Sequence, residues 1–247
     1  MTANHPAGRW VRALSTIAQQ EAPDNGADNV AKSLSRICRA AAHELGGSGA
    51  GVTVLSEQGG RGFAAASDET AYMLEELQFT LGEGPCIDAY ETRRPVLVPD
   101  LTADTALRRW PVYAPAVREH DIRAVFALPL QVGALHLGAL DLFRHQTGPL
   151  TKDAFDQALT FAEIALTVVL DGQGTTTGRT LPVGFDQSPG FRAEVAQAQG
   201  MIMVQLGVTI EEALIRLRAH AYAEGRPLHH VAQDVVDRKL RFDQTQE

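Results

Sequence analysis

Cysteine and long apolar runs are both scarce in this sequence. Only two of its 247 residues are cysteines, Cys38 and Cys86, which are too few for a disulfide framework or a structural zinc site. No apolar run reaches the length of a membrane span. The first twenty residues lack the continuous apolar region and the small-residue cleavage site of a secretory signal. We therefore expect a cytoplasmic protein.

Positive charge is also in short supply. The chain has 22 Lys and Arg against 30 Asp and Glu, a net charge of −8. This balance argues against non-specific binding to nucleic acid or to anionic membranes, so we expect neither DNA nor a membrane as a partner. Residues 196–247 carry six basic and seven acidic side chains and are nearly neutral. Charge alone does not make this tail a nucleic-acid binder.

Hydrophobic residues are plentiful, at 45% of the chain, so a sizeable core can form. The order of elements predicts an α+β domain around a mainly antiparallel sheet flanked by helices, followed by an all-α domain of three helices. A stretch rich in Gly, Thr and Pro marks the boundary between them. The predicted divisions are an N-terminal extension 1–27, a first domain 28–171, a linker 172–187, a second domain 188–242 and a tail 243–247.

Within the first domain the patterns are local and specific. Periodic apolar residues predict helices over 28–45, 69–79 and 151–171, and Pro85 favours the start of a short helix. The predicted strands are 49–56, 62–67, 95–101 and the two arms of a hairpin over 123–144 that turns near Gly133.

The three predicted tail helices have clear start and stop signals. The first begins near Ser188 and ends at Gly207, because glycine readily takes the left-handed conformation that ends a helix. Thr209 and Glu212 form a capping box for the second helix, and the third begins around Pro227. Gly200 lies inside the first helix, where it costs roughly 1 kcal/mol relative to alanine. Either it allows two helices to pack closely, or it leaves room for a ligand.

The tail resembles an ANTAR domain, the three-helix RNA-binding module of bacterial antiterminators. The matching positions are Ala198, Gly200, Met203, Glu212, Ala213, Leu217, Arg218, Leu228, Val231 and Ala232. The resemblance implies that a dimer of such modules binds RNA hairpins with small loops in nascent transcripts and prevents formation of the terminator. Loop bases suit such recognition because they are unstacked and accessible.

From this resemblance we expect the RNA contacts to lie on the first two tail helices and the turn that follows. The candidates are Ala198, Gln199, Gly200, Met203, Arg216, Arg218 and Arg226. Gln199 departs from the family, which usually has lysine there, but its amide can still bond a base edge or a phosphate. Arg218 and Arg226 offer planar guanidinium groups to phosphates or bases. The alternative for each arginine is an exposed helix face without a ligand.

Residues 28–171 resemble a GAF domain, a fold that senses small molecules. The resemblance lies in the phrases "AGVTVL", "LQFTLGEGPCIDAYETRRPVLVPDL" and "RAVFALPLQVGALHLGALDLFR" and in the closing helix. It implies a pocket between the sheet and the segment that covers it. The candidate lining residues are Phe79, Glu83, Cys86, Asp100, Trp110, Tyr113 and Asp141. The alternative is a structural role, with Trp110 and Tyr113 in the core and Asp100 in a turn.

Cys86 follows a glycine-rich phrase, "FTLGEGPC", that is not a phosphate loop because no Gly-Lys-Ser/Thr follows. Its thiol is either a packed structural group or a nucleophile or redox sensor near a helix start. The eight histidines show no metal-ligand spacing. We expect no bound metal, no cofactor and no catalytic residue.

These features favour a homodimeric, non-enzymatic regulator of transcription antitermination. Its GAF domain would sense an unknown small molecule or a redox signal, and its ANTAR domain would bind RNA. Helix 151–171 would connect the two domains and pair with its copy in the dimer. Two alternatives remain: a cysteine-dependent GAF-type reductase, and a regulator that acts through protein contacts without binding RNA.

Overall fold

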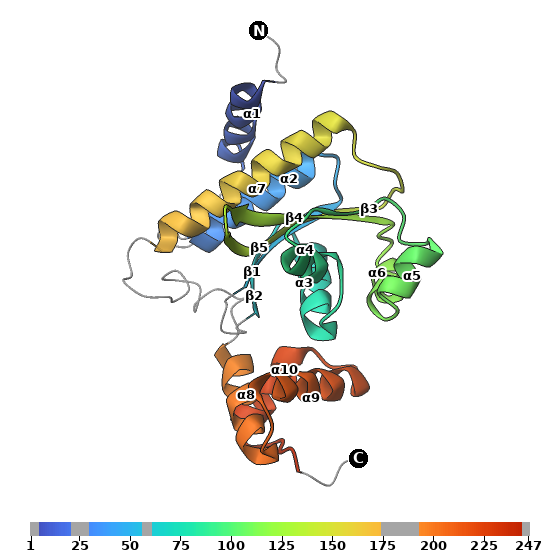
Figure 1. The fold of residues 1–247 in the computed structure, drawn as a ribbon, viewed down its shortest axis with the longest axis vertical. Helices are drawn as coiled ribbons and strands as arrows, with labels where there is room; N and C mark the ends of the chain where they lie inside the picture. Colours follow the sequence, from blue (N-terminus) through green and yellow to red (C-terminus); the bar gives the residue numbers. More distant parts are fainter. Residues whose placement is uncertain (1–4, 21–29, 56–60, 174–192, 244–247) are drawn as a thin grey trace.

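We describe the protein from a computed structural model, which covers residues 5–20, 30–55, 61–173 and 193–243. An α+β domain lies above a smaller domain of three helices (Figure 1). This arrangement confirms the expected fold class. Most of the predicted linker, from residue 174 onward, lies outside the described residues, as does the predicted helix start at Ser188.

A five-stranded antiparallel sheet forms the middle layer of the first domain. Its strands are β1 (Gly49–Leu55), β2 (Arg61–Ala66), β3 (Val96–Val98), β4 (Ala124–Val132) and β5 (Leu135–Arg144), in the order β2-β1-β5-β4-β3. Strands β4 and β5 form the predicted hairpin. Gly133 lies in its turn with φ +58°, a left-handed conformation that glycine adopts without a steric penalty.

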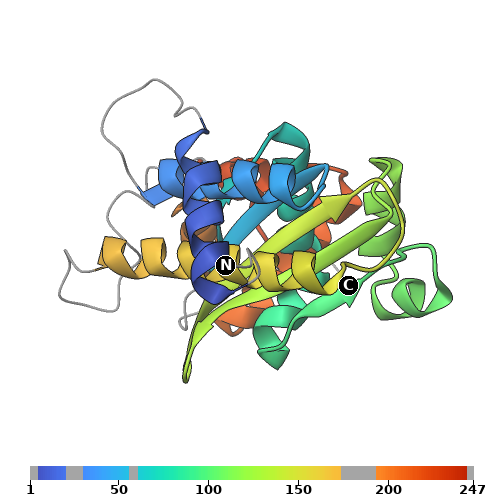
Figure 2. The ribbon, with the colours of Figure 1, turned by 90° about the horizontal axis from the view of Figure 1, so that it is seen from above.

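Three helices lie on one side of this sheet (Figures 1 and 2). Helices α2 (Val30–Glu44) and α7 (Lys152–Gln173) cover the sheet directly, and α1 (Pro6–Ala18) lies outside them. The core between them and the sheet is built from aliphatic and aromatic side chains such as Leu34, Ile37 and Phe161. Helix α1 belongs to the predicted N-terminal extension, for which the sequence indicated no element. It packs on α2 and α7.

Four further helices lie on the opposite side of the sheet. They are α3 (Glu69–Leu81), α4 (Pro85–Thr92), α5 (Asp104–Arg109) and α6 (Tyr113–Glu119). Asp68 caps α3 by accepting a hydrogen bond from the backbone N–H of Ala71, and Gly82 ends the helix with φ +69°. The turn at Gly82 and Glu83 therefore separates α3 from α4 and brings Pro85 to the first turn of the next helix.

The second domain consists of α8 (Ala193–Leu206), α9 (Ile210–Ala223) and α10 (Leu228–Val236). Gly207 follows α8 with φ +68°, and the predicted capping box of Thr209 and Glu212 is present at the start of α9. The apolar faces of the three helices share one small core.

Helix α3 lies between the sheet and the three-helix domain (Figure 1). It contacts β1 and β2 on one side and α9 on the other. Phe79 of α3 is buried in the same cluster as Leu217 and Leu228 of the second domain. The two domains therefore meet through this helix. Among the described residues, no helix is both long and apolar enough to cross a membrane.

Candidate functional site

A polar cluster is buried between α3 and the sheet. Glu75 and Gln78 of α3 are each 1% exposed, and Asp141 of β5 is completely buried. The Thr53 hydroxyl of β1 donates a hydrogen bond to Glu75 Oε2 at 2.6 Å, and Gln78 Nε2 donates to Asp141 Oδ2. Buried polar groups are costly unless they are hydrogen-bonded. The cluster is therefore a specific feature of this face of the sheet.

The backbone makes room for the cluster at a glycine. Gly51 of β1 lies directly opposite Asp141 of β5 in the strand pairing. A Cβ atom at Gly51 would stand only 2.5 Å from the Glu75 side chain. Because Gly51 has no side chain, the Glu75 carboxyl group can lie against the sheet beside Asp141.

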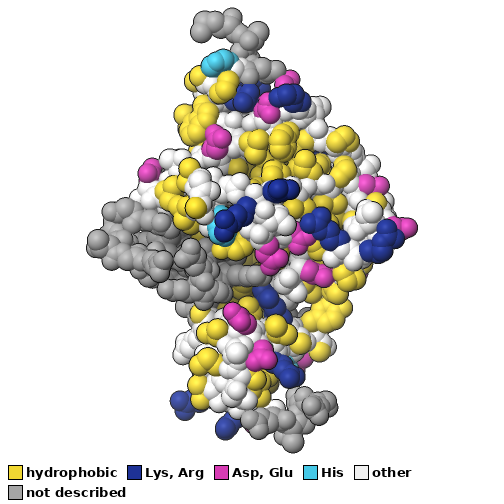
Figure 3. All heavy atoms as spheres, in the orientation of Figure 1, with side chains coloured by type: hydrophobic (Ala, Val, Ile, Leu, Met, Phe, Trp, Pro, Cys, Tyr) yellow, Lys and Arg dark blue, Asp and Glu magenta, His cyan; other side chains and the backbone are white. Residues whose placement is uncertain are grey.

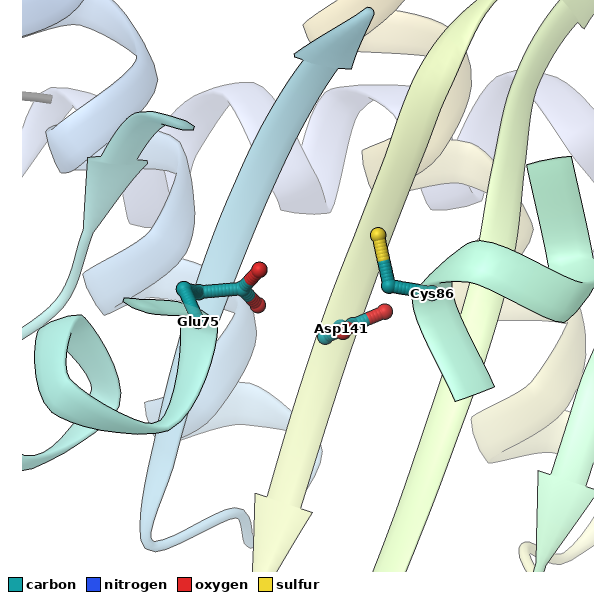
Figure 4. A group of neighbouring side chains, drawn as sticks. All are labelled: Glu75, Cys86 and Asp141. Atoms are coloured by element: carbon teal, nitrogen blue, oxygen red, sulfur yellow. The ribbon is translucent and has the colours of Figure 1, made fainter. Parts of the chain in front are cut away.

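The Cys86 thiol completes the cluster from α4. The backbone N–H of Cys86 donates to Gln78 Oε1 at 2.8 Å, so Gln78 connects α4 to Asp141. Figure 4 shows the Glu75, Cys86 and Asp141 side chains converging from α3, α4 and β5. Their ligand atoms all lie within 4.8 Å of one another. Carboxylate and thiolate groups gathered in this way can hold a cation.

Burial changes the acidity of both carboxyl groups. It raises the pKa of Glu75 well above its usual range, and the neighbouring Asp141 charge raises it further. Burial also raises the pKa of Asp141 to about 7, against the opposing effect of the Gln78 and Glu75 hydrogen bonds. A charged carboxylate is unfavourable in a dry environment. At neutral pH the pair therefore accepts a proton, or another cation, readily.

Tyr113 and Trp110, two further candidate pocket residues, lie in the same buried core as Cys86. Both are buried, and their rings make an edge-to-face contact at 6.5 Å. Glu83 positions them indirectly, because its carboxylate accepts hydrogen bonds from the backbone N–H groups of Val112 and Tyr113 at 2.8 and 2.7 Å. Neither the Tyr113 hydroxyl nor the Trp110 indole N–H has a hydrogen-bond partner among the described residues.

Two other predicted pocket residues lie elsewhere. Phe79 does not belong to the polar cluster. It lies on the side of α3 that faces α9 and packs into the core of the second domain. Asp100 accepts hydrogen bonds from the backbone and hydroxyl of Thr102, and these bonds lower its pKa. It therefore forms a turn, as the structural alternative proposed.

The contact between the domains covers a predicted RNA contact. The Arg218 guanidinium of α9 lies over the Phe79 ring, 5.4 Å from its centre. The same guanidinium lies against Gly82, where an added Cβ would come within 2.7 Å of Nη1. Beside it, His229 of α10 pairs with Glu76 of α3 at 3.7 Å. Arg218 is thus half-buried against α3, whereas the sequence suggested an exposed side chain.

The predicted contacts on α8 divide into buried and accessible positions. Ala198 is buried, and Gln199 is only 7% exposed, with its Nε2 donating to the Ile210 carbonyl at 3.0 Å. Neither therefore presents its side chain to RNA in this conformation. Gly200 and Met203 are half-buried. A Cβ at Gly200 would meet nothing within 4 Å, which removes the helix-packing explanation of this glycine.

The two remaining arginines also differ from one another. Arg216 of α9 is exposed. Arg226 pairs with Glu224 at 3.0 Å and with Asp234, so its guanidinium already has two carboxylate partners. On the face shown in Figure 3, basic and acidic side chains are interspersed over the three-helix domain, without a continuous basic patch. RNA binding there would depend on a few specific contacts.

The sequence analysis missed three members of the polar cluster: Thr53, Glu75 and Gln78. Polar residues on a helix and a threonine in a strand are common on exposed faces, so these residue types alone do not indicate a buried cluster. The available signal was their spacing on α3. Glu75 lies four residues after the buried Ala71, and Gln78 lies four residues after the buried Leu74, which places both on the buried side of the helix.

Comparisons with known proteins agree with this division of the chain. The GAF domain family matches residues 27–170, and the ANTAR domain family matches residues 191–236. A search of curated proteins finds no match.

Solved structures similar to the chain are GAF domains of low sequence identity. One is the GAF domain of a phosphoenolpyruvate-protein phosphotransferase from Coxiella burnetii, with 14% identity and a TM-score of 0.54, covering 71% of this chain and 98% of that one. The corresponding Acinetobacter domain has 11% identity and a TM-score of 0.51, covering 69% and 96%. Free methionine-R-sulfoxide reductase from Neisseria meningitidis, at 13% identity, 69% and 92% coverage and a TM-score of 0.46, is too distant to indicate a shared activity.

Proposed function

The chain belongs to the GAF family and carries an ANTAR domain after its GAF domain, and we propose from this that it is a signal-responsive regulator of transcription antitermination. The GAF domain receives a small-molecule or redox signal at the polar cluster of Thr53, Glu75, Gln78, Cys86 and Asp141. The ANTAR domain binds hairpin loops of nascent RNA.

One observation supports the coupling of the two activities. Helix α3 supplies Glu75 and Gln78 to the buried cluster, and the same helix supplies Glu76 and Phe79 to the contact with the ANTAR domain. Any change in the cluster that shifts α3 therefore also alters the surface that covers Arg218. Packed helices transmit such shifts because their side-chain contacts have few alternative arrangements.

The RNA-binding surface would then be completed when α3 releases Arg218. Arg216 is exposed on the same helix, and the open space over Gly200 allows close approach to the α8 backbone. A released Arg218 would add a planar group that can stack on a loop base or bond a phosphate. In the described conformation, the contact with α3 holds RNA affinity down.

We also propose that the protein is a homodimer, through its ANTAR helices. Helix α7 already buries its apolar residues against the sheet, α1 and α2, so it offers little apolar surface to a second copy. On α9, by contrast, Ile215 and Tyr222 are each 61% exposed. Sedimentation at micromolar concentration, with and without hairpin RNA, tests this proposal, and a monomer in both conditions would contradict it.

A cysteine-dependent reductase is not favoured. Cys38 lies in the core on the α2 side of the sheet and Cys86 in the core on the α3 side. The sheet separates the two thiols, so they cannot exchange a disulfide within one folded chain. We therefore propose a non-enzymatic role for the GAF domain.

The test is hairpin binding by the full chain at two salt concentrations, using an RNA recovered by crosslinking in cells. Phe79→Ala removes the surface that covers Arg218 and is expected to tighten binding about 5-fold or more. Arg218→Ala is expected to weaken binding by roughly 1–3 kcal/mol. Arg241→Ala removes an exposed arginine of the same domain and should leave affinity nearly unchanged.

Because Phe79 also belongs to the ANTAR core, its substitution could unfold that domain. Glu76→Gln is the second variant, since it weakens the pairing with His229 without removing apolar packing. Circular dichroism confirms that each variant is folded. Unchanged affinity in Phe79→Ala, Glu76→Gln and Arg218→Ala alike would remove this contact from the mechanism. Failure of crosslinking to recover any RNA would contradict the RNA-binding function itself.

A further inference from the structure

The buried cluster has the composition of a metal site. Glu75, Cys86 and Asp141 come from three separate elements, and their ligand atoms lie within 4.8 Å of one another (Figure 4). All three side chains are at most 1% exposed. Zinc takes two carboxylate oxygens and one thiolate at about 2.0–2.3 Å each. A tetrahedral ion would draw these atoms closer together than 4.8 Å, so the side chains would move inward on binding.

The two carboxyl groups lack a counter-charge. In the ranges 5–20, 30–55, 61–173 and 193–243, no Lys, Arg or His pairs with Glu75 or Asp141, and their hydrogen-bond donors, Thr53 and Gln78, are neutral. Glu75 and Asp141 also share a hydrogen bond, which requires a proton on one of them. Apart from this shared proton, Glu75 Oε1 and Asp141 Oδ1 are buried and receive no donor from the described residues. Either a shared proton or a cation must neutralise the pair.

A second observation points to a ligand at the same place. Tyr113 is completely buried, and its hydroxyl has no hydrogen-bond partner among the described residues. Tyr113 lies in the same buried core as Cys86, and burial together with the charges of Asp141, Glu75 and Cys86 raises its pKa. An unsatisfied phenol in a dry core is unusual, and a bound ion or its water would satisfy it.

The thiol distinguishes a metal from a shared proton. A proton between two carboxyl groups requires no sulfur ligand, whereas thiolate ligands favour zinc-like transition metals over magnesium and calcium.

Gly51 also keeps space for the Glu75 carboxyl group, because a Cβ there would overlap it. The site is thus assembled from α3, α4, β1 and β5.

We propose that Glu75, Asp141 and the Cys86 thiolate bind one divalent transition-metal ion of the zinc class. Binding releases the thiol proton and any proton held by the carboxyl pair to solvent. The Tyr113 hydroxyl or a water occupies the remaining coordination position. The proposal names the ligand class of the sensor site and takes its regulatory meaning from the proposed function, but the metal site stands on its own geometry.

The experiment measures metal content in the full, untagged chain under reducing conditions. Protein treated with a chelator is incubated with zinc, freed of excess ion and analysed by mass spectrometry. Wild type is expected to hold about one zinc per chain, and Asp141→Asn and Cys86→Ser much less. Cys38→Ser is the matched control, because Cys38 is an equally buried thiol on the opposite face of the sheet. It should retain the metal.

Cobalt provides a second readout that needs no variant. Thiolate coordination in the wild-type chain should produce a ligand-to-metal absorption band, and added zinc should abolish it. The proposal would be overturned if the wild-type chain held no metal. It would also be overturned if Asp141→Asn and Cys86→Ser held as much metal as Cys38→Ser. Hairpin binding is measured on the same samples. If the chain binds hairpin RNA but does not bind metal, only the metal site is overturned. If it binds metal but does not bind RNA, the RNA function is overturned and the metal site stands.

Discussion

Both faces of the sheet are covered by helices, but the two faces bury different chemical groups. In the part of the chain that the structure describes, the face under α2 and α7 buries no carboxyl group, whereas the face under α3 and α4 buries Glu75 and Asp141. Each face also holds one cysteine, Cys38 or Cys86. Apolar packing alone stabilises a fold, but buried carboxyl groups oppose it unless they are neutralised. Both faces therefore bury an apolar core, and the comparison places the candidate ligand site on the face under α3 and α4.

The largest effect is expected on the apolar face. Phe161→Ala removes a completely buried ring between α7 and the sheet, and we expect a loss of about 3–5 kcal/mol in unfolding free energy. Denaturant unfolding of the full chain measures it. A loss below about 1 kcal/mol would show that this face does not carry the stability of the domain.

On the polar face, Gly51→Ala is the sharpest steric test. The added Cβ would lie 2.5 Å from the Glu75 side chain, so the carboxyl group must move. We expect a destabilisation of about 1–3 kcal/mol, together with loss of bound zinc. Unchanged stability and unchanged metal content would mean that Glu75 does not need the space over Gly51.

The two faces should also differ in pH dependence. A raised pKa stabilises the fold below the ordinary value, 3.8 for Asp141, and this stabilisation is lost as pH rises towards about 7. Stability of the metal-free chain should therefore fall between these values, by up to about 1.4 kcal/mol per pH unit for each titrating carboxyl group. Asp141→Asn should flatten the slope. Equal slopes in both proteins, measured by urea unfolding, would contradict the assignment.

The smallest change is expected at Gly200 of α8. Because a Cβ there meets nothing within 4 Å, Gly200→Ala should raise stability by about 1 kcal/mol through helix propensity alone. If the open surface accepts an RNA loop, the same variant should bind hairpin RNA more weakly. A thermal midpoint that rises without any loss of RNA affinity would remove Gly200 from the RNA-binding surface.

Local signals predicted most of the fold. The capping box of Thr209 and Glu212, the turn at Gly133 and the helix start at Pro85 each depend on residues near one another in sequence, and all three are present. Helix α1 was not predicted, although Pro6 lies in its first turn and Trp10, Ala13 and Ile17 recur at three- and four-residue intervals on its buried side.

The candidate site was less predictable because it depends on non-local pairing. Asp141 and Cys86 were expected near a pocket, but only the pairing of β1 with β5 places Gly51 opposite Asp141 and leaves space for Glu75. The contact of Arg218 with Phe79 joins two domains. No local pattern reports on such a contact, so Arg218 was expected to be exposed and Phe79 to line the pocket.

The central claim is that α3 connects the buried cluster to RNA binding, and Glu75→Gln tests it most directly. This substitution lies inside the GAF core, where the polar partners of Glu75 in the described part of the chain are Thr53 and Asp141. Hairpin affinity of the full chain is compared for wild type, Glu75→Gln and the opposite-face control Cys38→Ser. We predict a change of about 5-fold or more for Glu75→Gln and none for Cys38→Ser. Equal affinities in all three folded proteins would contradict the account.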